Sequence, residues 1–426
     1  MIRLIKKPPL SNRCLANLLL FSVLFGICHP GFAAAPRRSG RPGRVQTGLD
    51  VLEAQKFAPL RGKHIGLITN HTGVDSQGRS AVEVLSKAAG VHVVALFSPE
   101  HGLLGRNDEK VSSIKDPQTG LPIFSLYGET LRPTDEMLQG IDALVFDIQD
   151  AGVRFYTYIS TLALAMKAAA GRGIPFVVLD RPNPIGGEAV AGPVLDPRWK
   201  SFMGMYALPV VHGMTIGELA RLFNTEYGIN ANLTVVPMEG WRRSMWFDET
   251  ALPWVITSPG IPHFLTAVLY PAMGPIGDTN LSVGTLTTKP FEFVGQTFVQ
   301  PWRLREALEA RHIPGVAFRE AYWRGEPWTD VGGPTYAGVE FRVIDRNAYR
   351  PVDLTLQILD VFRRSYPTGF KWGRSYSGSY VFDWDMGTDQ VRRQLVAGKS
   401  PAEIEQSWEP DLQRFLAVRA KYLLYH

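Results

Sequence analysis

The sequence predicts an α/β protein in which a Rossmann-like parallel-sheet N-terminal domain precedes a smaller α+β C-terminal domain. Its 426 residues suffice for two domains of ordinary size. From Lys63 onward, runs rich in β-branched residues alternate with helical stretches, and the runs at 91–97 and 176–179 are apolar almost without interruption. Such strands lie in the middle of a parallel sheet, where helices cover both faces. Beyond Pro290 strands and helices no longer alternate, which predicts the second domain.

Each expected element of the first domain rests on a local pattern. After Asp150, apolar residues recur at spacings of three and four and predict one face of a helix. Thr215 and Glu218 form the capping box that starts a later helix. Between 241 and 289, Pro and Gly make the pattern irregular. Strands are expected at 64–69, 91–97, 143–147, 174–180, 208–211 and 233–237, and helices at 80–89, at 157–170 and from Thr215 onward.

The C-terminal domain has a different order of elements. Helices are expected at 302–311, 351–366 and 401–425, with strands at 316–322 and 339–344 between the first two. The N-terminal domain is expected to span 47–289 and the C-terminal auxiliary domain 290–426.

The first 33 residues have the three-part pattern of a secretory signal peptide. Basic residues precede an apolar run at 15–27, and small residues follow at 31–35. Cleavage after Ala33 is expected, which leaves 34–46 as a basic flexible tail. A lipoprotein anchor at Cys28 is the alternative, but bulky Ile27 stands where a small residue is wanted. We therefore expect an exported protein, periplasmic or secreted.

Charge and cysteine use exclude several classes of protein. The chain has 45 Lys and Arg residues against 40 Asp and Glu, but the basic residues of the leader and the tail all precede the first acidic residue, Asp50. The rest of the chain therefore carries no excess of positive charge with which to bind nucleic acid. Both cysteines, Cys14 and Cys28, lie in the leader, which excludes a Cys nucleophile, a thiolate metal site and disulfides from the mature chain. No later apolar stretch approaches the length of an integral membrane span.

Polar residues cluster directly after the expected strands. Ligands of an open parallel sheet bind beyond the carboxyl ends of its strands, so these residues are expected around one rim. The clusters supply Asn70, Glu100, His101, Asp147, Gln149, Asp150, Arg154, Asp180, Arg181, Asn183 and His212.

Structural roles compete with chemical ones in these clusters. Asp150 and Asp180 suit helix caps, Asn183 suits a turn, and Arg154 suits an ion pair with Asp150. Glu100 differs, because it follows a proline at a strand end and is held on a turn. A catalytic role is therefore expected for Glu100.

The motifs narrow the reaction class. Four histidines lie in or beside the loops, but no His-x-His or His-Glu-x-x-His motif occurs, so we expect no metal. Neither a Gly-x-Gly-x-x-Gly turn nor a Gly-x-Ser-x-Gly elbow is present, so we expect no dinucleotide or other cofactor and no serine hydrolase. Glycoside hydrolysis, which carboxylates perform, is the class that remains for an exported protein.

Four blocks of sequence resemble the exo-β-N-acetylmuramidases, the NamZ-type family that was formerly a domain of unknown function. They are Ser-Pro-Glu-His-Gly at 98–102, the run at 147–158, Leu-Asp-Arg-Pro-Asn-Pro at 179–184 and the run at 212–220. The blocks fall in order, and the similarity covers most of the mature chain. The resemblance implies a Rossmann-like catalytic domain with a smaller C-terminal domain. It also implies an exo-acting glycoside hydrolase that releases N-acetylmuramic acid from the non-reducing end of peptidoglycan fragments, in cell-wall recycling or lysis.

The resemblance also implies roles for single residues. Glu100 matches the family's proposed catalytic glutamate and is the expected general acid/base. The second catalytic group stays open between Asp147, Asp150 and the substrate's own acetamido group. Residues expected to line the pocket are Asn70, His101, Asp147, Gln149, Tyr156, Tyr158 and His212, and Asp180, Asn183 and Asn280 complete the expected substrate-binding set. Arg154 and Arg181 are our candidates for the lactyl carboxylate of muramic acid, because a guanidinium binds a carboxylate with two parallel hydrogen bonds.

Two blocks depart from the family pattern. Gly260 stands where the family usually has Asn, and Thr285 and Leu286 replace an Arg and a Gly. The loss of a cation and an amide leaves the exact sugar open. A non-catalytic cell-wall sugar-binding protein and a metal-dependent amidase or esterase are the alternative functions, and the oligomeric state is unknown.

Overall fold

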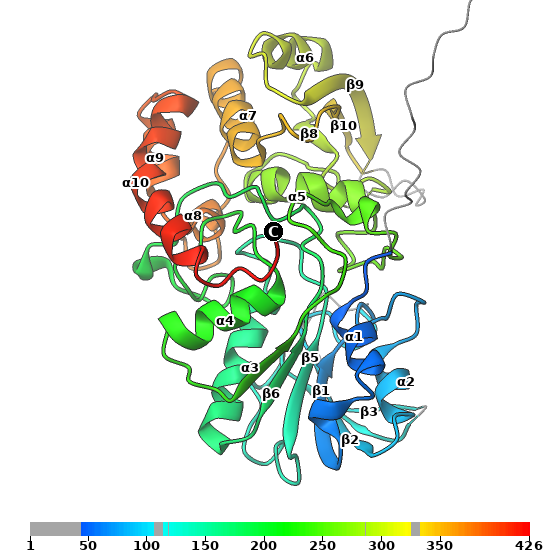
Figure 1. Cartoon of the computed structure of the whole chain (residues 1–426). Helices are drawn as coiled ribbons and strands as arrows, with labels where there is room; N and C mark the ends of the chain where they lie inside the picture. Colours follow the sequence, from blue (N-terminus) through cyan, green and yellow to red (C-terminus); the bar gives the residue numbers. More distant parts are fainter. Residues whose placement is uncertain (1–43, 106–113, 118, 286, 325–332) are drawn as a thin grey trace, which may run out of the picture. The chain divides into compact units, whose positions relative to one another are not determined.

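The computed structural model describes residues 44–105, 114–117, 119–285, 287–324 and 333–426 (Figure 1). The expected signal peptide, nearly all of the basic tail and Leu286 lie outside these residues, so their predictions stay predictions.

A seven-stranded sheet forms the N-terminal part of the described chain and confirms the predicted fold class. Its order is β3-β4-β2-β1-β5-β6-β7, and every neighbouring pair is parallel except β3 and β4. The strands are β1 (Lys63–Thr69), β2 (Val91–Ser98), β3 (Ile114–Lys115), β4 (Pro122–Ser125), β5 (Ala143–Asp147), β6 (Phe176–Leu179) and β7 (Leu233–Val236).

Helices cover both faces of this sheet, because successive side chains of a strand point to opposite faces. Ile65 and Leu67 of β1 pack in one hydrophobic cluster with α1 (Gly48–Ala54) and α2 (Ala81–Ser86). Ile68 packs in a second cluster with α3 (Tyr158–Arg172) and α4 (Ile216–Glu226). The predicted capping box of Thr215 and Glu218 starts α4.

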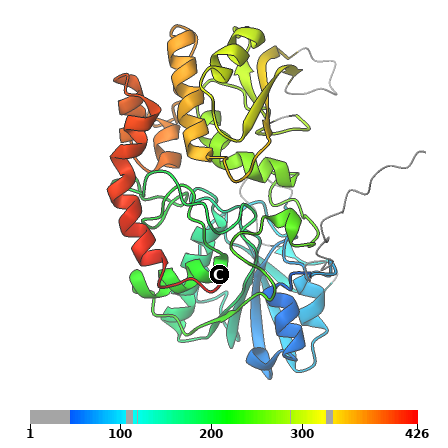
Figure 2. The ribbon, with the colours of Figure 1, turned by 45° about the horizontal axis from the view of Figure 1, so that its top comes forward.

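The C-terminal part contains a three-stranded antiparallel sheet and a set of helices (Figure 2). The strands, in the order β8-β10-β9, are β8 (Phe293–Gln296), β10 (Thr335–Val343) and β9 (Val316–Arg324). The helices are α5 (Phe264–Gly277), α6 (Pro301–Glu309), α7 (Pro351–Ser365), α8 (Val381–Met386), α9 (Gln390–Val396) and α10 (Pro401–Arg419). Buried residues of both parts share one hydrophobic cluster. The domain boundary at 289/290 stays a prediction.

Three local predictions were wrong for identifiable reasons. Helix α5 lies in the stretch read as irregular, because Pro271 and Pro275 stand inside it and proline normally interrupts a helix. No strand forms at 208–211, where Val211 makes only isolated bridges with Val153 and Ala191. Helix α10 ends at Arg419, and the last residues turn back toward the large sheet.

Candidate active site

The large sheet changes direction beside β1. From β1 the chain adds β2 and β4 on one side, then returns to place β5 on the other side. The loops after β1 and β5 therefore diverge, and this point of a parallel sheet is where ligands bind. The Thr69 hydroxyl donates to the Asp147 carbonyl over 2.8 Å and joins the two strand ends.

A cavity of about 920 Å³ lies beside this point. Among the described residues, Glu100 is the only carboxylate on its wall. The aromatic side chains of the wall are Tyr127, Phe155, Tyr156, Phe202, Tyr270 and Phe291. Its other polar side chains are His101, Thr157, Ser258, Thr285 and Thr287. A mostly apolar wall with a few polar groups is typical of a small-molecule site.

Two residues with hydroxyl groups interact with the Glu100 carboxylate. Thr157 is the N-cap residue of α3, but its hydroxyl makes no bond to that helix and donates instead to Oε2 of Glu100. Tyr127 lines the cavity beside the same carboxylate, and burial together with Glu100 raises the pKa of Tyr127 to about 12. Tyr127 is therefore a protonated phenol at neutral pH.

His101 follows Glu100 with a left-handed backbone, at φ of 69°. This conformation is uncommon for a residue with a Cβ atom and concentrates at functional sites. The His101 ring meets the Tyr158 ring edge-on, with 6.5 Å between the centroids. The imidazole thus lies beside Glu100 on the wall of the cavity.

Two tyrosines pack together at the cavity, one of them on its wall. Asn70 donates to the Tyr158 hydroxyl over 3.0 Å, and that hydroxyl donates to the Thr257 carbonyl over 2.9 Å. Tyr156 lines the cavity, and its ring centroid lies 4.7 Å from that of Tyr158. Burial raises the pKa of both phenols, so both are neutral. Of the predicted site residues, the structure thus brings Asn70, Glu100, His101, Tyr156 and Tyr158 together.

The other predicted carboxylates lie buried, away from the lining of this cavity. Arg181 donates to Asp147 over 2.5 Å and to the Val74 carbonyl over 2.7 Å, and both charged side chains are almost fully covered. Burial raises the pKa of Asp147, which Arg181 opposes. Asp150 accepts a hydrogen bond from the amide of Gly152 and lies 3.6 Å from His212 Nε2.

Asp180 fixes the start of α4. Its carboxylate accepts hydrogen bonds from the Thr215 hydroxyl over 2.8 Å and the Gly217 amide over 2.7 Å. The Tyr425 hydroxyl donates to it over 2.6 Å. A Cβ atom on residue 217 would lie 2.7 Å from this carboxyl group, so glycine is needed there. Burial raises the pKa of Asp180 to about 6.

Amide side chains support the same loops. Gln149 donates to the carbonyls of Asp150 and Pro182, over 2.9 and 2.7 Å. Asn183 donates to the Met214 carbonyl over 3.0 Å. Both amides thus bind backbone carbonyls of the loops, and neither side chain lines the cavity.

Two further predicted site residues lie elsewhere. Arg154 is 1 % exposed and does not pair with Asp150; its guanidinium donates to the carbonyls of Pro193, Leu208 and Asp385. Asn280 bonds the backbone of Gly369 and Lys371, each over 2.8 Å. The structure does not bring Arg154 or Asn280 to the cavity that Glu100 lines.

Sequence reasoning missed Tyr127, Thr157 and Tyr270. Tyr127 follows β4, and that short strand was not recognised, so the strand-end argument was never applied to it. Thr157 was read only as the start of a helix, and Tyr270 lies in the unrecognised helix α5. The departures from the family pattern at Gly260 and Thr285 do fall on the cavity wall.

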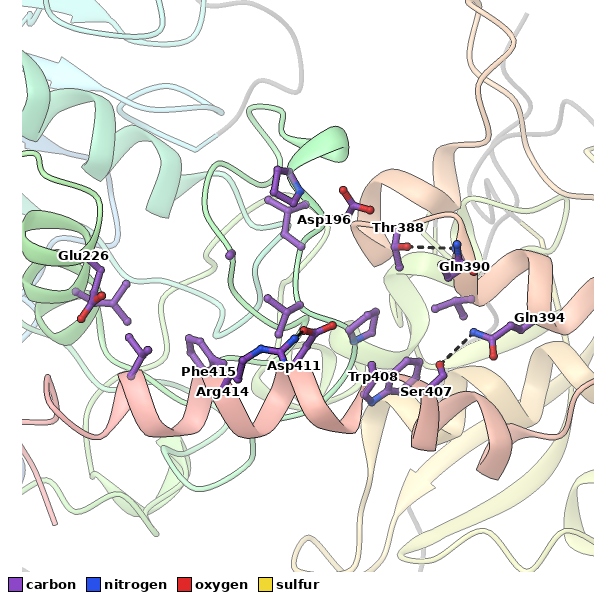
Figure 3. A pocket seen from close by; sticks show the side chains of 18 of the residues that line it. Asp196, Glu226, Thr388, Gln390, Gln394, Ser407, Trp408, Asp411, Arg414 and Phe415 are labelled. Atoms are coloured by element: carbon purple, nitrogen blue, oxygen red, sulfur yellow. Dashed lines mark hydrogen bonds and ion pairs between the residues drawn. The ribbon is translucent and has the colours of Figure 1, made fainter.

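A second cavity, of about 930 Å³, lies between α10, α9, α4 and the loop at 193–197 (Figure 3). Several of its polar side chains are already hydrogen-bonded within the protein. The Gln394 side chain donates to Ser407 over 3.1 Å, the Gln390 backbone amide donates to the Thr388 hydroxyl over 3.2 Å, and Arg414 pairs with Asp411. The two cavities are nearly equal in size, but the one with Glu100 contains a carboxylate that a threonine hydroxyl binds just beyond a strand end.

The described ranges contain no group of three or more His, Cys, Asp or Glu side chains that could hold a metal ion. Within the same ranges, no helix has the length and apolar character needed to cross a membrane.

Comparisons with known proteins agree across nearly the whole described chain. The family model "exo-beta-N-acetylmuramidase NamZ, N-terminal" matches residues 65–265, and its C-terminal counterpart matches residues 268–425. The peptidoglycan beta-N-acetylmuramidase NamZ of Bacillus subtilis is 45% identical over 390 residues, which cover 91% of this chain and 93% of that protein.

Two crystal structures of DUF1343 family proteins from Bacteroides fragilis have the same fold. One has a TM-score of 0.83 at 37% identity, and the other 0.70 at 29% identity. Each comparison covers 90% of this chain and 99% of the other. The chain therefore belongs to the exo-β-N-acetylmuramidase NamZ family and is a glycoside hydrolase.

Proposed function

We propose that this chain is an exo-acting β-N-acetylmuramidase that releases N-acetylmuramic acid from the non-reducing end of peptidoglycan fragments. The observation that carries the proposal is the Glu100 carboxylate, which lines a cavity of about 920 Å³ and accepts a hydrogen bond there from Thr157. The Bacillus subtilis relative, named for this activity, supports the reaction class.

Glu100 acts as general acid/base in this proposal. Glycoside hydrolysis needs a group that exchanges a proton beside the anomeric carbon. Among the described residues that line the cavity, Glu100 is the only carboxylate. The aromatic side chains of the wall offer apolar faces to the C–H groups of a sugar ring. The placement of Arg154 and Arg181 supports structural roles, because backbone carbonyls and Asp147 already occupy their guanidiniums.

Export is a second part of the proposal. The basic, apolar and small-residue segments at the N-terminus support a cleaved signal peptide, with peptidoglycan fragments as the partner outside the cytoplasm. Expression in a bacterial host, fractionation and N-terminal sequencing test it. A mature chain that begins at Ala34 is expected, and an uncleaved cytoplasmic chain would contradict it.

Hydrolysis of a chromogenic N-acetylmuramoside beside the matching N-acetylglucosaminide tests the activity. The wild type should release the aglycone faster from the muramoside. Glu100→Gln should lower kcat/KM by about 10²–10⁴-fold, because the amide cannot exchange the proton. Glu409→Gln, at an exposed position of α10, is the matched control and should keep full activity.

Two outcomes would contradict the proposal. Saturable binding of muramyl sugars without turnover would indicate a sugar-binding protein. Activity that a chelator abolishes and zinc restores would indicate a metal-dependent amidase or esterase.

A further inference from the structure

We propose that Tyr127 is the second catalytic group of this pocket: its phenol oxygen attacks the anomeric carbon, and Glu100 is the base that takes the phenol proton. This inference rests on the proposed glycosidase function and deepens it, because it names the group that forms the covalent bond.

The sheet itself places Tyr127 beside Glu100. Strands β2 and β4 are parallel neighbours, and their last paired residues are Ser98 and Ser125. Glu100 and Tyr127 each lie two residues beyond this pair, so they occupy equivalent positions on adjacent strand ends. The Leu126 amide donates to the Ser98 carbonyl over 2.8 Å and extends the pairing by one residue. Both residues therefore follow closely after paired strand ends, which places their segments side by side.

The Tyr127 and Glu100 side chains both line the cavity, and they interact with each other there. Tyr127 is only half-buried, and its ring lies 5.9 Å from that of Phe202, another wall residue. Its pKa, raised to about 12, leaves the phenol protonated. A phenol becomes a nucleophile when an adjacent base removes its proton, and Glu100 is placed to be that base.

Other candidates for the second group lack this combination of features. Asp147 is fully buried against Arg181, and Asp150 is 4 % exposed beside His212. The Tyr158 hydroxyl is occupied by Asn70 and the Thr257 carbonyl. Glycosidases that use a tyrosine in place of the second carboxylate are an established exception to the two-carboxylate pattern.

The reaction balances in two steps. In the first, the Tyr127 oxygen bonds to the anomeric carbon and the phenol proton passes to Glu100. The glycosidic bond breaks, and the leaving oxygen keeps its electron pair and takes a proton from His101, which lines the same cavity and is assigned here as the acid for the leaving group. In the second, water attacks the anomeric carbon and gives a proton to His101. The Tyr127 oxygen leaves with its electron pair and recovers its proton from Glu100.

Thr157 provides the matched comparison, because its hydroxyl also bonds Glu100. As the N-cap residue of α3 it acts only through the carboxylate, and it is a positioning residue. Thr157→Val removes one hydrogen bond to a charged group and should lower kcat/KM by about 10- to 100-fold. Tyr127→Phe removes the attacking oxygen and should lower it by at least about 10³-fold.

The decisive experiment uses a 2-deoxy-2-fluoromuramyl fluoride. Its fluoride leaves readily and its C2 fluorine slows both steps, so a covalent glycosyl-enzyme accumulates. It also lacks the acetamido group, so the substrate cannot supply the nucleophile. Intact mass should show one added glycosyl group in the wild type and in Thr157→Val, and peptide mapping should place it on Tyr127. Tyr127→Phe should gain no mass.

Three outcomes would overturn the role of Tyr127. They are a label on Glu100, an unlabelled wild type that still hydrolyses the N-acetylmuramoside, and a Tyr127→Phe variant with more than about a tenth of wild-type activity. A wild type that hydrolyses no muramoside would instead overturn the proposed function. Circular dichroism and denaturation of each variant show that it is folded.

Discussion

Two groups of polar residues follow the strands of the large sheet. They differ in their burial and in the partners that they contact. Beyond β5 and β6, Asp147, Asp150 and Asp180 are buried, and Arg181, backbone amides and Tyr425 supply their contacts. Beyond β2 and β4, Glu100 and Tyr127 interact with each other and line a cavity. Both groups therefore lie at strand ends. The buried aspartates belong to the structural framework, and the residues that line the cavity are the reactive ones.

The C-terminal part of the chain contributes to this difference at Asp180. Arg419 donates to the carbonyls of Gly187 and Gly213, and Tyr425 reaches the Asp180 carboxylate. These contacts cover the loops after β6. Around β2 and β4 the wall of the cavity comes instead from loops such as 258–261 and leaves Glu100 accessible.

The largest expected effect on the framework comes from Arg154. Arg154→Met leaves three buried carbonyl groups without their donor, so it should lower the free energy of unfolding by about 3–5 kcal/mol, measured by urea denaturation. Activity per folded molecule should persist, unlike that of Glu100→Gln.

Arg154→Lys is the control, since it keeps the charge but not the planar fork, and an intermediate loss is expected. An Arg154→Met protein that is as stable as the wild type but inactive would contradict the structural role of Arg154 and would assign it to the active site.

A buried acid pair should make the stability of the framework depend on pH. Asp278, at the end of α5, and Asp385 of α8, whose backbone carbonyl accepts from Arg154, are both buried and interact with each other. Burial raises the pKa of both carboxyl groups. The folded protein therefore keeps a proton that the unfolded chain releases. Stability should be greatest at acidic pH and fall as pH rises from the ordinary carboxyl range through the raised values.

Urea denaturation of wild type and Asp278→Asn between pH 6 and 9 measures this effect. For one retained proton the loss approaches about 1.4 kcal/mol per pH unit. The asparagine variant keeps a hydrogen-bond donor that does not titrate, so its stability should vary less. Parallel curves for the two proteins would mean that the pair is ionised in the fold.

The smallest effect is expected at the C-terminal end of the framework. Tyr425→Phe removes the hydroxyl that donates to Asp180 and accepts from the Met238 amide over 2.9 Å. A loss of about 1–2 kcal/mol is expected in the same denaturation assay. Tyr376→Phe, at a fully exposed position, is the matched control and should show no change.

The sequence predicted the parallel sheet well because its strands are buried on both faces and read as apolar runs. It also located Glu100 and His101, which lie directly after a recognised strand, whereas Tyr156 was expected only from the family resemblance. It could not separate Asp147 from Glu100, because burial depends on segments far along the chain. Tyr127 was not predicted because it follows β4. That strand has only four residues, which are too few to show a clear alternation of apolar and polar side chains.

The contacts around Tyr425 have a consequence for how the protein is made. The Arg243 amide donates to the carbonyl of His426, and Tyr425 binds Asp180 at the end of β6. The ribosome synthesises Tyr425 more than two hundred residues after β6. The large sheet therefore gains these hydrogen bonds only after nearly all of its strands and covering helices have left the ribosome. A chain that ends before Tyr425 would leave the Asp180 carboxylate without its tyrosine.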